Sequence, residues 1–188
     1  MSALTDFSRL LLISALAIAV VACGTRSIES DLGIAGAPDW VNEGTRTLND
    51  NRGRLFHGVG SAPAMDDESL QKATADNRAR AELASILSLF MEVAIQDYTA
   101  VELDGENTFS EQSITRQIDS AARLNLTGSQ IIANWRNPDT GIIYSLAEIN
   151  LARVKELTES VGEMNPGVRT HIRDRGDNIF DGVIGAGQ

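Results

Sequence analysis

The chain has one cysteine and two histidines among its 188 residues, and this scarcity excludes several kinds of site. Because Cys23 is the only cysteine, no disulfide can form within the chain. A metal site built from histidine and cysteine needs more ligands than His57, His171 and Cys23 supply. A catalytic thiol is expected inside a fold beside a base, whereas Cys23 ends an apolar run near the N-terminus.

Basic residues are also scarce. Sixteen Lys and Arg stand against 26 Asp and Glu, which gives a net charge of -10. Nucleic-acid binding rewards cations that neutralise phosphates, so we expect no nucleic-acid partner. So acidic a protein is also repelled by anionic lipid headgroups unless a covalent anchor holds it at the membrane.

Long apolar runs are limited to residues 10–22, which only Ser14 interrupts. A membrane-spanning helix needs roughly 20 apolar residues, so this run is too short for one. It has the length of the apolar region of a secretory signal, and small residues close it. The alternative, a buried N-terminal helix, should show polar residues at a 3.6-residue period, and this run shows none. Residues 1–22 are therefore predicted to be a signal peptide.

The four residues Val20-Val21-Ala22-Cys23 resemble the bacterial lipobox. In proteins with that motif the cysteine becomes the first mature residue, its sulfur carries a diacylglyceryl group, and its amine is usually acylated. Two or more acyl chains anchor a protein stably, at roughly 0.8 kcal/mol per buried CH₂. The resemblance implies lipidation at Cys23, and Gly24 after it favours the outer membrane of a Gram-negative cell. Residues 23–37 would form the lipidated tether.

The mature chain is long enough for one compact domain, which we place at residues 38–162. Trp40 should hold its N-terminal end on the core. Residues 55–62 read as a strand with Phe56 and Gly58 on one face. A long helix over residues 67–98, with Asp66 as its N-cap, shows apolar residues at three- and four-residue spacing.

A second helix is predicted to open at Ser110, and residues 126–136 alternate as a strand. Residues 137–141 are of the types that form turns and are predicted to connect a β-hairpin, with residues 142–149 as its second strand. Asn150 can cap a helix over residues 151–161. The order β-α-α-β-β-α predicts an α/β (α+β) fold, with a three-stranded antiparallel or mixed sheet covered on one face by the long helix and one or two others. Residues 163–188, with many glycines and mixed charge, are predicted to be a flexible tail or a docking segment outside the core.

Each candidate for chemistry has a structural interpretation that we favour. Residues 58–61 resemble a phosphate loop, but no Lys follows, so glycines that allow close packing of the long helix explain them better. His57 has no Ser or Cys partner at motif spacing and should be a half-buried or solvated side chain. The acids at 66–68 suit a helix N-terminus and lack the pattern of a calcium loop. A basic cluster, which is solvated or weakly contacts an acidic partner, comprises Arg169, His171, Arg173 and Arg175. We expect no catalytic residue, metal or cofactor.

Taken together, these segments resemble the LPP-twenty lipoprotein family of bacterial outer-membrane lipoproteins. The resemblance is carried by the lipobox, by "APDWV" at 37–41, "HGVGSA" at 57–62, "QKATADNRARAELASIL" at 71–87 and "IIANWRNPDTGIIYSLAEI" at 131–149. It implies a structural or assembly role in the envelope, since some members look like subunits of disks around the flagellar motor. Others are surface antigens, so the domain could face the periplasm or the cell surface. Its partner would be the same chain or another envelope or flagellar protein.

The alternative function is a periplasmic ligand-binding or accessory module tethered to an envelope machine. It requires a concave pocket near residues 58–61 with convergent polar groups. An enzyme has the least support from the sequence, because no nucleophile and base or set of ligands is visible.

Overall fold

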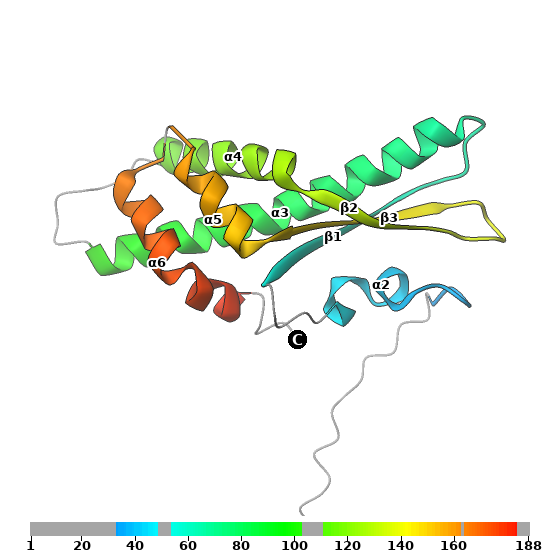
Figure 1. The fold of residues 1–188 in the computed structure, drawn as a ribbon, viewed down its shortest axis with the longest axis horizontal. Helices are drawn as coiled ribbons and strands as arrows, with labels where there is room; N and C mark the ends of the chain where they lie inside the picture. The colour runs from blue at the N-terminus through cyan, green and yellow to red at the C-terminus, as the bar shows by residue number, and fades with distance from the viewer. Residues whose placement is uncertain (1–32, 49–53, 103–110, 163, 184–188) are drawn as a thin grey trace, which may run out of the picture. The chain divides into compact units, whose positions relative to one another are not determined.

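The computed structural model describes residues 33–48, 54–102, 111–162 and 164–183. Two short helices, α2 (Asp39–Asn42) and the 3₁₀ helix η1 (Gly44–Thr47), precede β1 (Leu55–Ala62) and the long helix α3 (Glu68–Glu102). They are followed by α4 (Glu111–Gly128), the hairpin of β2 (Gln130–Arg136) and β3 (Ile143–Asn150), α5 (Leu151–Glu159) and α6 (Pro166–Val183). Figure 1 shows α4, α5 and α6 gathered around the C-terminal half of α3, while the hairpin extends in the other direction.

The three strands form an antiparallel sheet in the order β1-β3-β2, so the predicted α+β fold is confirmed. β3 is the central strand, and β1 and β2 are the two edges. The register pairs Phe56 with Ile149 and Gly58 with Ala147, which places these four residues on the same face of the sheet.

Helix α3 lies against that face because both surfaces carry small residues where they meet. Ala75 and Ala79 are fully buried, and an added Cβ at Gly58 or Gly60 would overlap the backbone of α3. The prediction that the glycines of residues 58–61 allow close packing of the long helix is therefore confirmed. The larger buried side chains of α3 follow from Leu83 onward: Leu83, Leu87, Phe90, Met91 and Ile95.

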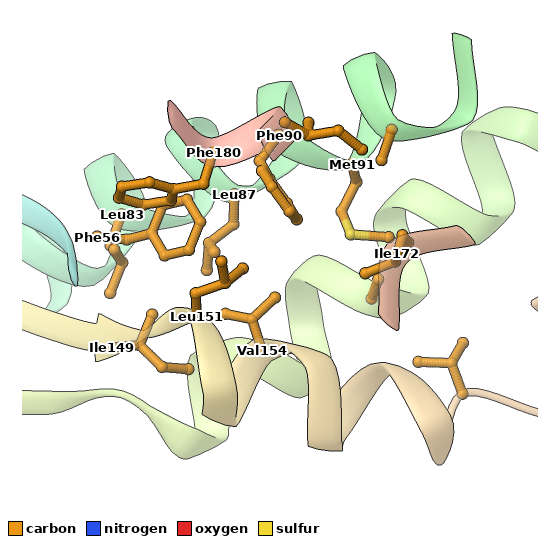
Figure 2. Close-up of a cluster of buried hydrophobic side chains, with 14 of the residues drawn as sticks. Phe56, Leu83, Leu87, Phe90, Met91, Ile149, Leu151, Val154, Ile172 and Phe180 are labelled. Carbon is orange, nitrogen blue, oxygen red and sulfur yellow. The ribbon is translucent and has the colours of Figure 1, made fainter. Parts of the chain in front are cut away.

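The main core is built around Phe56, whose ring meets two others edge to face. Its centroid lies 5.3 Å from that of Phe90 in α3 and 4.8 Å from that of Phe180 in α6 (Figure 2). Leu151 and Val154 of α5 complete this end of the core. As predicted, Asn150 caps α5, because its side chain accepts a hydrogen bond from the Arg153 N–H at 2.7 Å.

The prediction of a flexible tail outside the core was wrong for the residues that form α6. Val168, Ile172, Ile179 and Phe180 recur at helical spacing and are buried in the main core. Gly176 lies on the same helix against the side chain of Lys155, where a Cβ would stand 2.9 Å from Lys155 Cε. The glycines and charges that suggested disorder therefore belong to a docked helix. Residues 184–188 lie outside the described residues.

Several boundaries also differ from the sequence prediction, among them those of β3 (Ile143–Asn150, not 142–149) and α5, which ends at Glu159 and not at residue 161. α4 continues to Gly128, so the strand begins at Gln130 and not at Leu126. α3 extends to Glu102, and its N-cap is Asp67, whose Oδ1 accepts a hydrogen bond from the Leu70 N–H at 3.0 Å. Asp66 is therefore one residue too early to cap the helix.

Candidate functional site

Cys23 and most of the predicted tether lie outside the described residues, so lipidation stays a prediction. The described chain begins at Gly33. The first contacts of the folded part involve Asn42 of α2. Its Oδ1 accepts from the Ile34 N–H at 2.8 Å, and its amide donates to the Ile34 carbonyl at 3.0 Å. Trp40, the predicted anchor of this end, is 9% exposed.

The glycine-rich strand is packed against a helix and offers no space for a phosphate. Both Gly58 and Gly60 are buried under α3 at the helix turns around Ala79 and Leu83. The face on which a ligand pocket near residues 58–61 was expected is filled by these turns.

His57 is more deeply buried than the sequence suggested and has a carboxylate partner. Its Nε2 lies 2.9 Å from Glu148 Oε2, and the two residues are directly paired across β1 and β3. The His57 side chain is 6% exposed and that of Glu148 is 27% exposed. Because the pair joins neighbouring strands, we interpret it as a contact that fixes their register.

The predicted basic cluster on α6 is used to attach this helix to its neighbours. His171 Nε2 lies 2.8 Å from Asp97 Oδ2 of α3, and Arg175 Nε lies 3.7 Å from the same oxygen. Arg169 donates from Nη2 to the carbonyl of Val161 after α5 at 2.9 Å. The cluster therefore faces α3 and α5 through specific partners and is not a uniform basic surface.

A polar cluster that the sequence analysis did not single out joins α3 to the sheet. The Asp76 carboxylate accepts hydrogen bonds from Ser145 Oγ at 2.6 Å, Asn134 Nδ2 at 3.0 Å and Lys72 Nζ at 2.7 Å. Burial raises the pKa of Asp76, but the hydrogen bonds from Lys72, Ser145 and Asn134 outweigh it and hold the pKa below its ordinary value.

Asp76, Asn134 and Ser145 come from three separate elements, and 58 residues separate Asp76 from Asn134 in sequence. Ser145 is fully buried. A buried hydroxyl held by a carboxylate and an amide cannot meet a substrate, so we interpret the cluster as a support for β2 and β3.

A groove of about 450 Å³ lies beside this cluster, between the first turns of α3 and β2. Its walls include Glu68 and Lys72 from the helix and Trp135 and Arg136 from the strand. Arg136 Nη2 lies 2.6 Å from Glu68 Oε1, so an ion pair bridges the two walls. The predicted acid cluster at the helix N-terminus thus supplies both an N-cap and this cross-groove pair.

The backbone hydrogen bonds define which groups of β2 point away from the sheet. In an antiparallel pair, alternate residues hydrogen-bond to the neighbouring strand. The Asn137 N–H donates to the Ile142 carbonyl at 2.9 Å. The backbone groups of Trp135, two residues earlier, therefore also point toward β3. The backbone groups of Asn134 and Arg136 therefore point outward, along the free side of the groove. We take this edge, with its groove, as the candidate interaction site.

Comparison of the sequence with protein-family models and with curated proteins gives no match. None of the helices in the described ranges has the length and the apolar composition needed to span a bilayer.

Proposed function

We propose that the chain is an outer-membrane lipoprotein whose folded domain works as a structural or assembly module of the cell envelope. The observation that carries this proposal is the position of Cys23 at the end of the apolar run 10–22. A cysteine at that place suits lipid attachment, because acyl chains on the first mature residue would hold the protein at a membrane.

The start of the folded part is compatible with this anchor. Nine residues, 24–32, separate Cys23 from Gly33, where the described structure begins. A chain of that length reaches at most about 30 Å when fully extended. The domain would therefore stay close to the membrane surface.

A role in association is supported by how the domain uses its polar residues. The His57–Glu148 and His171–Asp97 pairs and the Asp76 cluster all join separate elements of the fold. The outward backbone groups of β2, in contrast, are available for pairing with another strand. Ligand binding near residues 58–61 is not proposed, because α3 fills that face of the sheet.

The anchor is tested with the full chain expressed in a Gram-negative cell that is supplied with labelled palmitate. We expect the wild-type chain to carry the label and to fractionate with the outer membrane. Cys23→Ser should lose the label and leave the outer membrane. Gly24→Asp is the matched control, because it keeps the cysteine and should keep the label while moving to the inner membrane. Label on Cys23→Ser, or an unlabelled wild-type chain, would show that the anchor is wrong.

The assembly role has a separate test. Deletion of the gene should remove an ordered structure from images of the envelope, and loss of motility would assign that structure to the flagellum. An unchanged envelope in the deletion strain would contradict the assembly role but would not contradict lipidation at Cys23.

A further inference from the structure

The two edges of the sheet are not equally open. In β1, the Ser61 carbonyl points outward and accepts a hydrogen bond from Arg78 Nη1 at 2.7 Å. By alternation, His57 and Val59 are the other outward residues near the middle of this strand. The 3₁₀ helix η1 also contacts β1. Side chains and loops that cover an edge are a common protection against strand addition.

The β2 edge has no such cover among the described residues. No described residue hydrogen-bonds to the outward backbone groups of Asn134 and Arg136, and all even-numbered residues of β2 are exposed. A register shift between Ile131 and Ala133 interrupts the strand, so the regular open stretch covers residues 133–136. The groove of about 450 Å³ runs along this stretch. An extended strand is the partner that both features fit, because it supplies backbone groups to the edge and side chains to the groove.

We propose that β2 pairs antiparallel with β2 of a second copy of this chain, so that the two sheets form one continuous sheet. This inference rests on the proposed assembly function and names the surface and the partner through which assembly begins. A two-fold axis at Asn134 would set Asn134 opposite the same residue of the second copy in a hydrogen-bonded pair. Trp135 would then lie opposite Ala133 of the second copy, where the small side chain leaves room for the indole.

The charges at this edge favour a second copy as the partner. The net charge of -10 opposes self-association in general. At this edge, however, each cation has its own carboxylate: Arg136 pairs with Glu68 at 2.6 Å, and Lys72 pairs with Asp76 at 2.7 Å. An edge of one sign would demand a partner of the opposite sign, whereas a locally neutral edge can meet its own copy without like-charge repulsion. The Ile132 side chain lies at the interruption of the strand and is 46% exposed. Pairing with the second copy would bury part of it at the end of the paired stretch.

The pairing is tested by disulfide formation in membranes from cells that express the full chain. Asn134→Cys should give a disulfide-linked dimer on mild oxidation, because directly opposite Cα atoms in a hydrogen-bonded pair lie about 5.5 Å apart. Val59→Cys, the matched position on the β1 edge, should stay monomeric. A dimer from Val59→Cys, no dimer from Asn134→Cys, or linkage of Asn134→Cys to a different protein would each overturn the proposal.

A second pair of variants avoids the loss of the Asn134 amide. Arg136→Ala and Arg136→Pro both remove the ion pair with Glu68, but only the proline also removes the outward N–H. Loss of the ion pair leaves Glu68 uncompensated in both variants, so the effect of the N–H is the difference between them: the proportion of chemically cross-linked dimer should be at least tenfold lower in Arg136→Pro than in Arg136→Ala. Equal dimer in both variants overturns the proposal. Palmitate label and outer-membrane position are read from the same samples, so loss of the dimer with the label kept contradicts this pairing alone, whereas loss of the label contradicts the proposed anchor.

Discussion

Gly60 of β1 lies directly against Ala79 of α3, with no room for a side chain between the two backbones. A Cβ on Gly60 would overlap the Ala79 backbone nitrogen and would stand 2.7 Å from the Ala75 carbonyl oxygen. Real Cβ atoms do not come so close to backbone, and a backbone helix turn cannot move aside as a flexible side chain can. This contact, together with that of Gly58, sets how closely the long helix approaches β1.

Gly60→Ala is therefore expected to destabilise the protein by about 3 kcal/mol, the upper part of the usual range for overpacking. The matched control is Gly162→Ala, because no heavy atom lies within 4 Å of the Cβ it would add. Its free energy of unfolding should stay within about 0.5 kcal/mol of wild type. Urea unfolding of the full chain and both variants measures the difference, and equal midpoints for Gly60→Ala and wild type would contradict the close contact.

Phe180→Ala tests whether α6 belongs to the core. The Phe180 ring is 8% exposed and meets the Phe56 ring edge to face with centroids 4.8 Å apart. Truncation should cost about 3 kcal/mol in the free energy of unfolding, since a buried ring leaves a cavity. Asn178→Ala, at an exposed position of the same helix, should change it little. If Phe180→Ala unfolded like wild type, α6 would not contribute to the core.

The difference between predicted and observed structure follows the range over which each interaction acts. The long helix, the strand at 55–62, the hairpin and the Asn150 cap were predicted because each depends on local spacing or on a turn residue a few positions away. Helix α6 was missed because it has few apolar residues and several glycines, so local propensity does not favour it. Its stability comes from tertiary contacts such as that of Phe180 with Phe56, which a local pattern does not contain.

At the candidate site, too, the features that depend on local spacing were predicted and those that depend on tertiary contacts were not. The hairpin and an unpaired edge strand were predictable from the alternation of residues 126–136 and the turn after it. The sequence could not tell which edge stays open, because that depends on Arg78 reaching Ser61 and on η1 contacting β1. Nor could it show the Asp76 cluster, since Asp76 and Ser145 lie 69 residues apart.

The ion pair between Arg54 and Asp181 should make the attachment of α6 sensitive to salt. Arg54 donates from Nε and Nη2 to the two oxygens of Asp181 at 2.9 and 3.0 Å, and the hydrogen bond lowers the pKa of Asp181. Arg54→Lys keeps the charge but loses the two-point geometry. We expect a lower Tm for Arg54→Lys at low ionic strength, and a smaller gap from wild type in 0.5 M NaCl, because exposed pairs are screened. A gap that is independent of salt would mean that the pair does not hold α6.

The Asp76 cluster should make stability depend on pH in a defined direction. The folded state holds the pKa of Asp76 below its ordinary value, because the hydrogen bonds from Lys72, Ser145 and Asn134 outweigh burial. An unfolded Asp titrates near about pH 3.9. Above that pH both states are ionised and the full stabilisation is present. As the pH falls below it, the unfolded state binds the proton first, so the stabilisation declines until the folded carboxyl is also protonated.

Asp76→Asn removes this titration while it keeps an oxygen that can accept hydrogen bonds. At pH 7 the variant should be less stable than wild type by about 1.5 to 3 kcal/mol, the typical contribution of a hydrogen bond to a charged group. The gap between the two unfolding free energies should stay constant down to about pH 5 and narrow below about pH 4. Ser145→Ala keeps the carboxylate and removes one donor, so its gap should narrow in the same window by a smaller amount. A gap for Asp76→Asn that stays constant to pH 2.5, or that widens on acidification, would show that the cluster does not stabilise the ionised carboxylate.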